Sequence, residues 1–216
     1  TISEEKTINE RESLELISQM IKNTKTNLGK GSGNAFLIWG YSCILASVVV
    51  LILGAGFHIQ HSGLAYFLIP VFGIAATLVL KHKNKKVESG HATTYIEKSV
   101  NTLYRCAGYA MFVYMALCFI LYYGHAEVWK GMFFLGLFIP AFCTYVAGSL
   151  LQKERIMDWS SAGLLFSCQI LGDMLVSDNV MIRMVIVGIV SWTFSLVIPG
   201  HILNKEAKKL SKDERA

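Results

Sequence analysis

The chain has 216 residues, of which 53% are hydrophobic and 16% are charged, and its formal net charge is +5. Soluble domains usually have about a quarter of their residues charged, so this chain has too few charges to cover a soluble surface. The composition excludes a disordered chain, a collagen-like chain and a disulfide-stapled secreted domain, and it leaves a large apolar core or a membrane.

Residues 1–33 are polar and predict a cytoplasmic amphipathic helix followed by a glycine-rich hinge. Thr7 and Glu10 fit a capping box, in which each residue accepts from the backbone of the other. Because its first half is acidic, anionic lipid would repel this helix, so we expect it to dock on a protein partner or a second copy. The predicted docking face consists of Leu14, Ile17, Ile21 and Leu28.

Six later stretches are almost free of charge, and each is long enough to cross a hydrocarbon layer of about 30 Å as a helix. A soluble helix of this length would show a polar face at a period of 3.6 residues, and these stretches do not. Between the second and third stretches, residues 92–104 predict a separate short helix. The predicted spans cover residues 35–57, 63–80, 106–123, 131–151, 159–177 and 180–203.

The positions of the basic residues predict the orientation of these spans. With both termini in the cytoplasm, 18 of the 20 lysines and arginines fall on the inner side, and only Lys130 and Arg183 fall outside. Such an excess of inner lysine and arginine is typical of multi-span membrane proteins. The pI of 8.9 therefore reflects membrane topology, and we expect no nucleic-acid partner.

The densest run of charge follows the second span directly. It is predicted to contact anionic headgroups or the acidic N-terminal helix, with an ordinary stop-transfer anchor as the alternative. The run consists of Lys81, Lys83, Lys85 and Lys86.

The prolines suggest a weak internal repeat of helical hairpins. Pro70, Pro140 and Pro199 each follow an isoleucine, and each lies in an even-numbered span. We predict an all-α polytopic membrane protein with six transmembrane helices arranged as three helical hairpins, N-in/C-in, plus the N-terminal helix. The predicted organisation is a cytoplasmic helix and hinge at 1–33, a transmembrane domain at 34–203 and a basic cytoplasmic tail at 204–216.

Two formal charges lie inside the apolar stretches, where an ionisable side chain is costly and therefore a functional candidate. Asp173 and Arg183 are each five residues from the centre of the last hairpin loop, so they can pair across it. Gln169 lies one helical turn before Asp173 and points the same way. Further candidates for hydroxyl or thiol contacts to the pair are Ser177, Cys168 and Ser191. The pair is either a staple that holds the hairpin or a site open to the outside for a solute or proton.

Three histidines in the outer loops have a spacing that would suit zinc or copper, or a pH sensor. They are His58, His61 and His125. Ordinary interfacial histidines are the alternative. No catalytic motif is present, and we predict no cofactor.

The segment from Glu10 to Ile21, the glycine and lysine hinge after it, and Phe36-Leu-Ile-Trp-Gly40 resemble a group of small uncharacterised bacterial membrane proteins. Those proteins have a charged amphipathic N-terminal helix and several spans. The resemblance implies a multi-pass protein of the bacterial inner membrane and no particular activity.

The leading functional interpretation is a non-enzymatic sensor or scaffold. It would use its cytoplasmic helix and basic loop to contact lipid, a cytoplasmic protein or a second copy through residues 1–28. The first alternative is a small transporter or channel with a polar site at Gln169, Asp173 and Arg183. The second is a membrane-embedded enzyme that acts on lipid or quinone.

Overall fold

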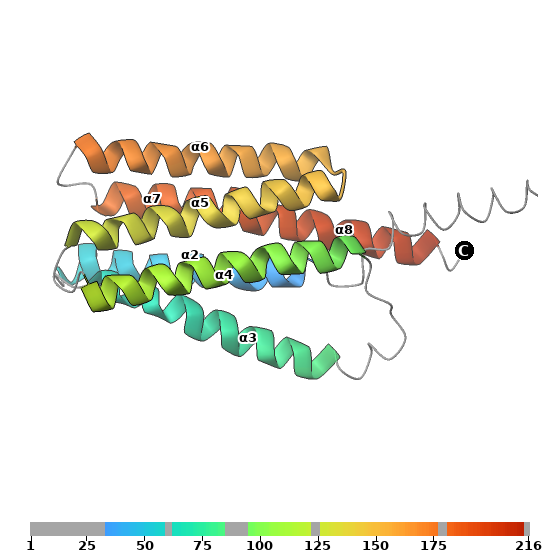
Figure 1. Ribbon diagram of the computed structural model, residues 1–216, viewed down its shortest axis with the longest axis horizontal. Helices are drawn as coiled ribbons and strands as arrows, with labels where there is room; N and C mark the ends of the chain where they lie inside the picture. The colour runs from blue at the N-terminus through green and yellow to red at the C-terminus, as the bar shows by residue number, and fades with distance from the viewer. Residues whose placement is uncertain (1–32, 59–61, 85–94, 122–125, 177–180, 214–216) are drawn as a thin grey trace, which may run out of the picture.

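The computed structural model describes residues 33–58, 62–84, 95–121, 126–176 and 181–213, and these ranges are helical apart from short turns (Figure 1). Two helices are extended by a short turn of different pitch. A π-helical turn, η1 (Ile52–Gly56), continues α2 (Asn34–Leu51), and a 3-10 turn, η2 (Ser62–Phe67), leads into α3 (Leu68–Asn84).

The remaining chain forms four long helices, the last of which has a π-helical turn inside it. Three of them are α4 (Tyr95–Leu121), α5 (Ala126–Leu150) and α6 (Glu154–Val176). The last consists of α7 (Met181–Trp192), η3 (Thr193–Val197) and α8 (Ile198–Asp213).

Six helical segments of the described chain are long and apolar enough to cross a membrane, which confirms the predicted number of spans. This is the architecture of a helical membrane protein. The segments are Asn34–Gly56, Ser62–Leu80, Lys98–Leu121, Lys130–Leu150, Glu154–Val176 and Ile182–Lys209.

One sequence-based boundary is wrong. The short helix expected at 92–104 is not separate, because α4 runs unbroken from Tyr95 to Leu121. Similarly, α8 continues past the end of the apolar sequence as far as Asp213, so the described part of the predicted basic tail is helical. Charged residues mark where the apolar part of a helix ends, but lysine and glutamate are good helix formers, so the backbone hydrogen bonds continue past that point.

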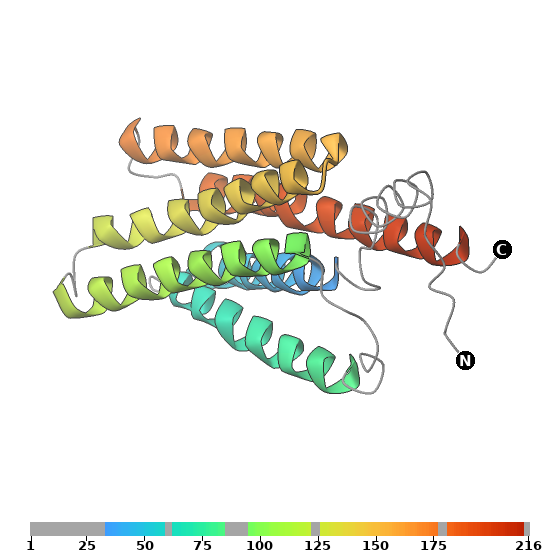
Figure 2. The same cartoon turned by 45° about the vertical axis from the view of Figure 1, so that its right-hand side comes forward.

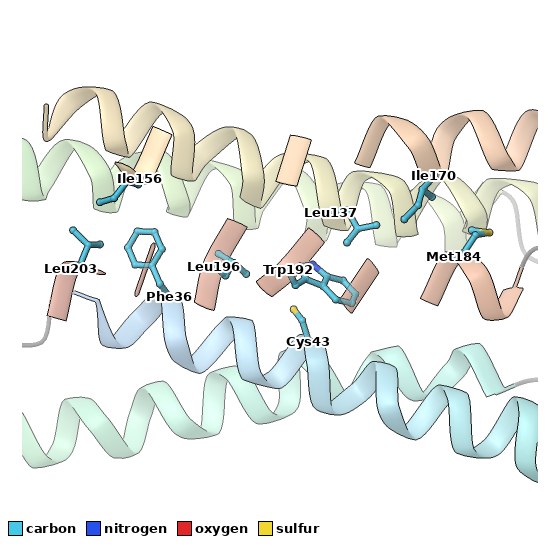
Figure 3. Packing of buried hydrophobic residues seen from close by; sticks show 9 residues of the cluster. All are labelled: Phe36, Cys43, Leu137, Ile156, Ile170, Met184, Trp192, Leu196 and Leu203. Atoms are coloured by element: carbon cyan, nitrogen blue, oxygen red, sulfur yellow. The ribbon is translucent and has the colours of Figure 1, made fainter. Parts of the chain in front are cut away.

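The core lies between α2, α5, α6 and the last helix. Nine buried side chains of these helices form a row along the bundle, with Trp192 at its centre, as Figure 3 shows. The row consists of Phe36, Cys43, Leu137, Ile156, Ile170, Met184, Trp192, Leu196 and Leu203.

The helices α3 and α4 lie at the edge of this core. Only 6% of the most apolar window of each is buried inside the molecule, against between 28% and 44% for the other four spans. Figures 1 and 2 both show α3 diverging from the bundle toward its Asn84 end. In a bilayer, the apolar faces of these two helices would therefore be covered mainly by lipid.

Small residues let α6 approach the last helix closely. A Cβ atom added at Gly163 would lie 2.9 Å from Cβ of Ser195 and 3.3 Å from the carbonyl oxygen of Ser191. Membrane helices commonly pack through such small residues, because close approach increases van der Waals contact where no hydrophobic driving force exists between helices.

We predict that Gly163→Ala lowers the free energy of unfolding by about 1–3 kcal/mol, because the added methyl group meets packed atoms of the facing helix. Gly172→Ala on the same helix is the matched control, since a Cβ there meets nothing within 4 Å. The control should be neutral, or stabilising by up to about 1 kcal/mol through helix propensity. Thermal unfolding in detergent measures both, and equal effects of the two substitutions would contradict the close contact.

Candidate functional site

The centre of the bundle contains a hydrogen bond between Trp192 and the backbone of α5. The indole Nε1 of Trp192 donates to the carbonyl oxygen of Gly136 over 3.1 Å. In a regular helix this carbonyl would accept from the residue four positions later, which is Pro140, inside α5. Proline has no backbone N–H, so its presence leaves the Gly136 carbonyl without a helix partner. Trp192 supplies the missing donor.

Aromatic rings enclose this hydrogen bond. Trp192 is 2% exposed, and its ring packs edge-on against Phe133 of α5 at a centroid distance of 5.8 Å. Tyr66 of η2 lies 6.2 Å from Trp192 and 5.2 Å from Phe133. Trp192 therefore packs inside the bundle, against α5 and η2. The hydrogen bond from Trp192 to the Gly136 carbonyl was not predicted. The sequence does show which carbonyl lacks a donor, because Pro140 lies four residues after Gly136.

A seam of hydroxyl groups lies beside Trp192, between α6 and the last helix. Ser191 Oγ donates to the carbonyl oxygen of Gly163 over 3.0 Å and lies 3.2 Å from Ser167 Oγ. Ser167 Oγ in turn donates to the same carbonyl over 2.8 Å. Ser195, one turn further along, is buried, and its hydroxyl makes no hydrogen bond to the described residues. The expectation that Ser191 joins Asp173 is therefore wrong, because Ser191 bonds within this seam.

A third polar contact joins α4 to α5. Thr144 Oγ1 donates to the carbonyl oxygen of Pro140 over 2.8 Å, and it lies 2.6 Å from the hydroxyl of Tyr104. Because the single Thr144 proton is already used, Tyr104 is the donor in the second bond. Like the other two contacts, this one satisfies polar groups within the bundle.

The predicted pair of charges does meet at the end of the α6–α7 hairpin. Nη2 of Arg183 lies 2.5 Å from Oδ1 of Asp173. The Asp173 side chain is 11% exposed and that of Arg183 is 63% exposed. Gln169 is exposed, and its side chain bonds neither charge within the described residues. This geometry is that of a hairpin staple, although the second carboxylate oxygen of Asp173 is buried without a hydrogen-bond partner.

Polar contacts also join the start of α2 to α8, at the opposite end of the bundle. The Asn204 amide nitrogen donates to Oδ1 of Asn34 over 2.7 Å, and its oxygen accepts from the backbone N–H of Gly33 over 3.2 Å. The first N–H groups of a helix have no partner within it, and Asn204 supplies one here. Nearby, Lys153 forms a 2.7 Å ion pair with Glu206 of α8.

The predicted metal and basic sites are only partly within the described residues. His58 is exposed and has a positive φ of 53°, whereas His61 and His125 lie outside the described ranges. Among the residues that are described, no three histidine, cysteine or acidic side chains are grouped to hold a metal ion. Lys81 and Lys83 belong to the last turn of α3, and Lys85 and Lys86 lie outside the description, so both sites stay predictions.

The N-terminal docking face, with Leu14, Ile17, Ile21 and Leu28, also lies outside the described residues.

The three prolines occupy different positions in their helices. Pro70 is in the first turn of α3, Pro140 is inside α5, and Pro199 is in the first turn of α8, directly after η3. The hairpin repeat therefore stays a prediction.

Comparisons of the chain with protein-family models, with curated proteins and with solved structures found no match. The resemblance of the N-terminal forty residues to small bacterial membrane proteins thus stays a prediction.

We predict that Trp192→Phe lowers the free energy of unfolding by about 1 kcal/mol, because the indole donor is lost and the Gly136 carbonyl becomes an unpaired group in an apolar interior. Pro140→Ala restores a backbone N–H that can reach the same carbonyl. In the Pro140→Ala background, Trp192→Phe should therefore cost clearly less. Thermal unfolding of the wild type, both single variants and the double variant measures this coupling, and strictly additive effects would contradict it.

Proposed function

We propose that the protein is a non-enzymatic scaffold or sensor of the bacterial inner membrane, with both termini in the cytoplasm. One observation supports the proposal: several polar groups at the centre of the bundle bond to a neighbouring helix. The Trp192 indole bonds the Gly136 carbonyl of α5, the Ser191 hydroxyl bonds the Gly163 carbonyl of α6, and the Tyr104 hydroxyl of α4 bonds that of Thr144 in α5. A transport pathway would instead need such groups to line a cavity.

The distribution of charge supports the proposed orientation. Figures 1 and 2 show that the start of α2, the end of α3, the start of α4, the α5–α6 turn and the end of α8 lie at the same end of the bundle. Exposed basic residues gather at this end, among them Arg105, Arg155 and Lys205. Membrane proteins keep such residues on the cytoplasmic side. The proposed location in the bacterial inner membrane is supported only by the resemblance of the N-terminal segment to small bacterial membrane proteins.

The arrangement of the helices supports a sensing or scaffolding role. The helices α2, α5, α6 and α7–α8 supply the buried side chains of the core, and the weakly buried α3 and α4 flank it. The basic loop that carries Lys85 and Lys86 connects these two flanking helices. Contact of this loop with lipid or a partner would therefore act on the part of the bundle that is held least tightly.

Cysteine accessibility separates the scaffold from the transporter. The five native cysteines are all free thiols, so a variant without them is made first, and a single cysteine is then placed at Ser191 or at Glu154. Ser191 is buried in the seam, and Glu154 is exposed at the start of α6. We expect a charged, membrane-impermeant thiol reagent to label the cysteine at 154 from the cytoplasmic side only.

The same reagent should leave the cysteine at 191 unlabelled from both sides. Rapid labelling at 191 would reveal an aqueous path and favour the transporter with Gln169, Asp173 and Arg183. Labelling of the cysteine at 154 from the outside would overturn the orientation. The scaffold role further requires that deletion of residues 1–28 abolishes cross-linking to a cytoplasmic protein or a second copy in intact membranes, while the unfolding temperature of the remaining chain is unchanged.

A further inference from the structure

The outward face of α8 carries a row of basic side chains where this helix leaves the apolar region. The row repeats at intervals of four, three and one residues, which places its members on one side of an α-helix. The opposite side of α8 is packed, since Leu203 is 2% and Ala207 is 3% exposed. The exposed members of the row are His201, Lys205, Lys208 and Lys209.

A tyrosine from the first helix extends this face. The Tyr41 hydroxyl lies 3.0 Å from Nε2 of His201, and the two rings meet edge-on with centroids 6.3 Å apart. Tyr41 is 50% exposed, so the contact lies on the surface and not in the core. This bond joins α2 to α8 one helical turn before Lys205. Tyrosines at such positions typically place the ring in the apolar layer and the hydroxyl at the headgroup level.

The acidic residue of this part of α8 faces another direction. Glu206 is the one carboxylate in the sequence between residues 198 and 212, and it pairs with Lys153 of the α5–α6 turn over 2.7 Å. The Glu206 carboxylate therefore neutralises the Lys153 ammonium group. The side of α8 that carries Lys205 and Lys209 keeps a net positive charge.

The length of the last helix sets the depth of the row. The segment Ile182–Lys209 has 28 residues, which span about 42 Å, and the hydrocarbon layer is about 30 Å thick. The excess must lie in the headgroup layer or beyond it. The apolar sequence ends at Leu203, so His201 lies near the boundary and the lysines lie among the headgroups.

We propose that this surface, formed by Tyr41, His201, Lys205, Lys208 and Lys209 and here named the α8 basic face, binds the headgroup phosphate of an anionic phospholipid. The ammonium groups of Lys205 and Lys209 supply the positive charge that attracts anionic lipid, and the Tyr41–His201 pair forms the edge nearest the acyl chains. The inference rests on the proposed membrane insertion and not on the scaffold role.

The test uses the full chain in neutral detergent, titrated with phosphatidylglycerol or with phosphatidylcholine. The apparent affinity is read from the shift of the unfolding temperature, and bound lipid is counted by native mass spectrometry. Phosphatidylglycerol should stabilise the wild type, and phosphatidylcholine should not. The double variant K205Q/K209Q should lose about 30-fold in apparent affinity for phosphatidylglycerol, as expected for two juxtamembrane cations.

Two further variants and one soluble probe make the result decisive. R105Q/R155Q removes two exposed charges from the same end of the bundle and should change the affinity less than threefold, whereas K205R/K209R keeps both charges and should retain it. An equal loss in K205Q/K209Q and R105Q/R155Q would overturn the proposal, because the attraction would then be diffuse. Stabilisation of the wild type by soluble glycerol phosphate, or the absence of any preference for phosphatidylglycerol, would overturn it as well.

Discussion

The fold depends on the requirement that every backbone polar group within a bilayer finds a partner in the protein. Pro140 breaks this rule inside α5, because it cannot donate to the Gly136 carbonyl. The indole of Trp192 donates instead, over 3.1 Å. This bond joins the end of α7 to the middle of α5. A proline that would weaken an isolated helix becomes a specific point of attachment for another helix.

Close contacts between α6 and the last helix accompany that attachment. Once α7 lies against α5, the absence of a side chain at Gly163 lets α6 approach closely enough for Ser191 to bond its backbone. Several polar groups of the interior are used to join helices, whereas the Asp173–Arg183 pair lies at one end of the bundle and the Lys153–Glu206 pair at the other. A protein with this distribution is suited to present its ends to lipid and partners, which is the basis of the scaffold proposal.

The sequence predicts what depends on single helices and neighbouring residues. Six apolar stretches identify the six spans, and the symmetric spacing of Asp173 and Arg183 about one loop brings them together. The Trp192–Gly136 bond was not predictable, because it depends on which of several apolar helices pack side by side. The start of α4 was misjudged because hydropathy marks the limit of the lipid and not the limit of the helix.

Protection of the Trp192 indole proton from exchange with solvent tests the central claim most directly. The chain has four tryptophans, so the indole N–H signals of tryptophan-labelled protein in a nanodisc can be assigned with single substitutions. The account predicts that the signal lost in Trp192→Phe persists in heavy water far longer than that of Trp159, which is 38% exposed. Exchange of the two protons at equal rates would show that the Trp192–Gly136 bond does not hold the bundle together.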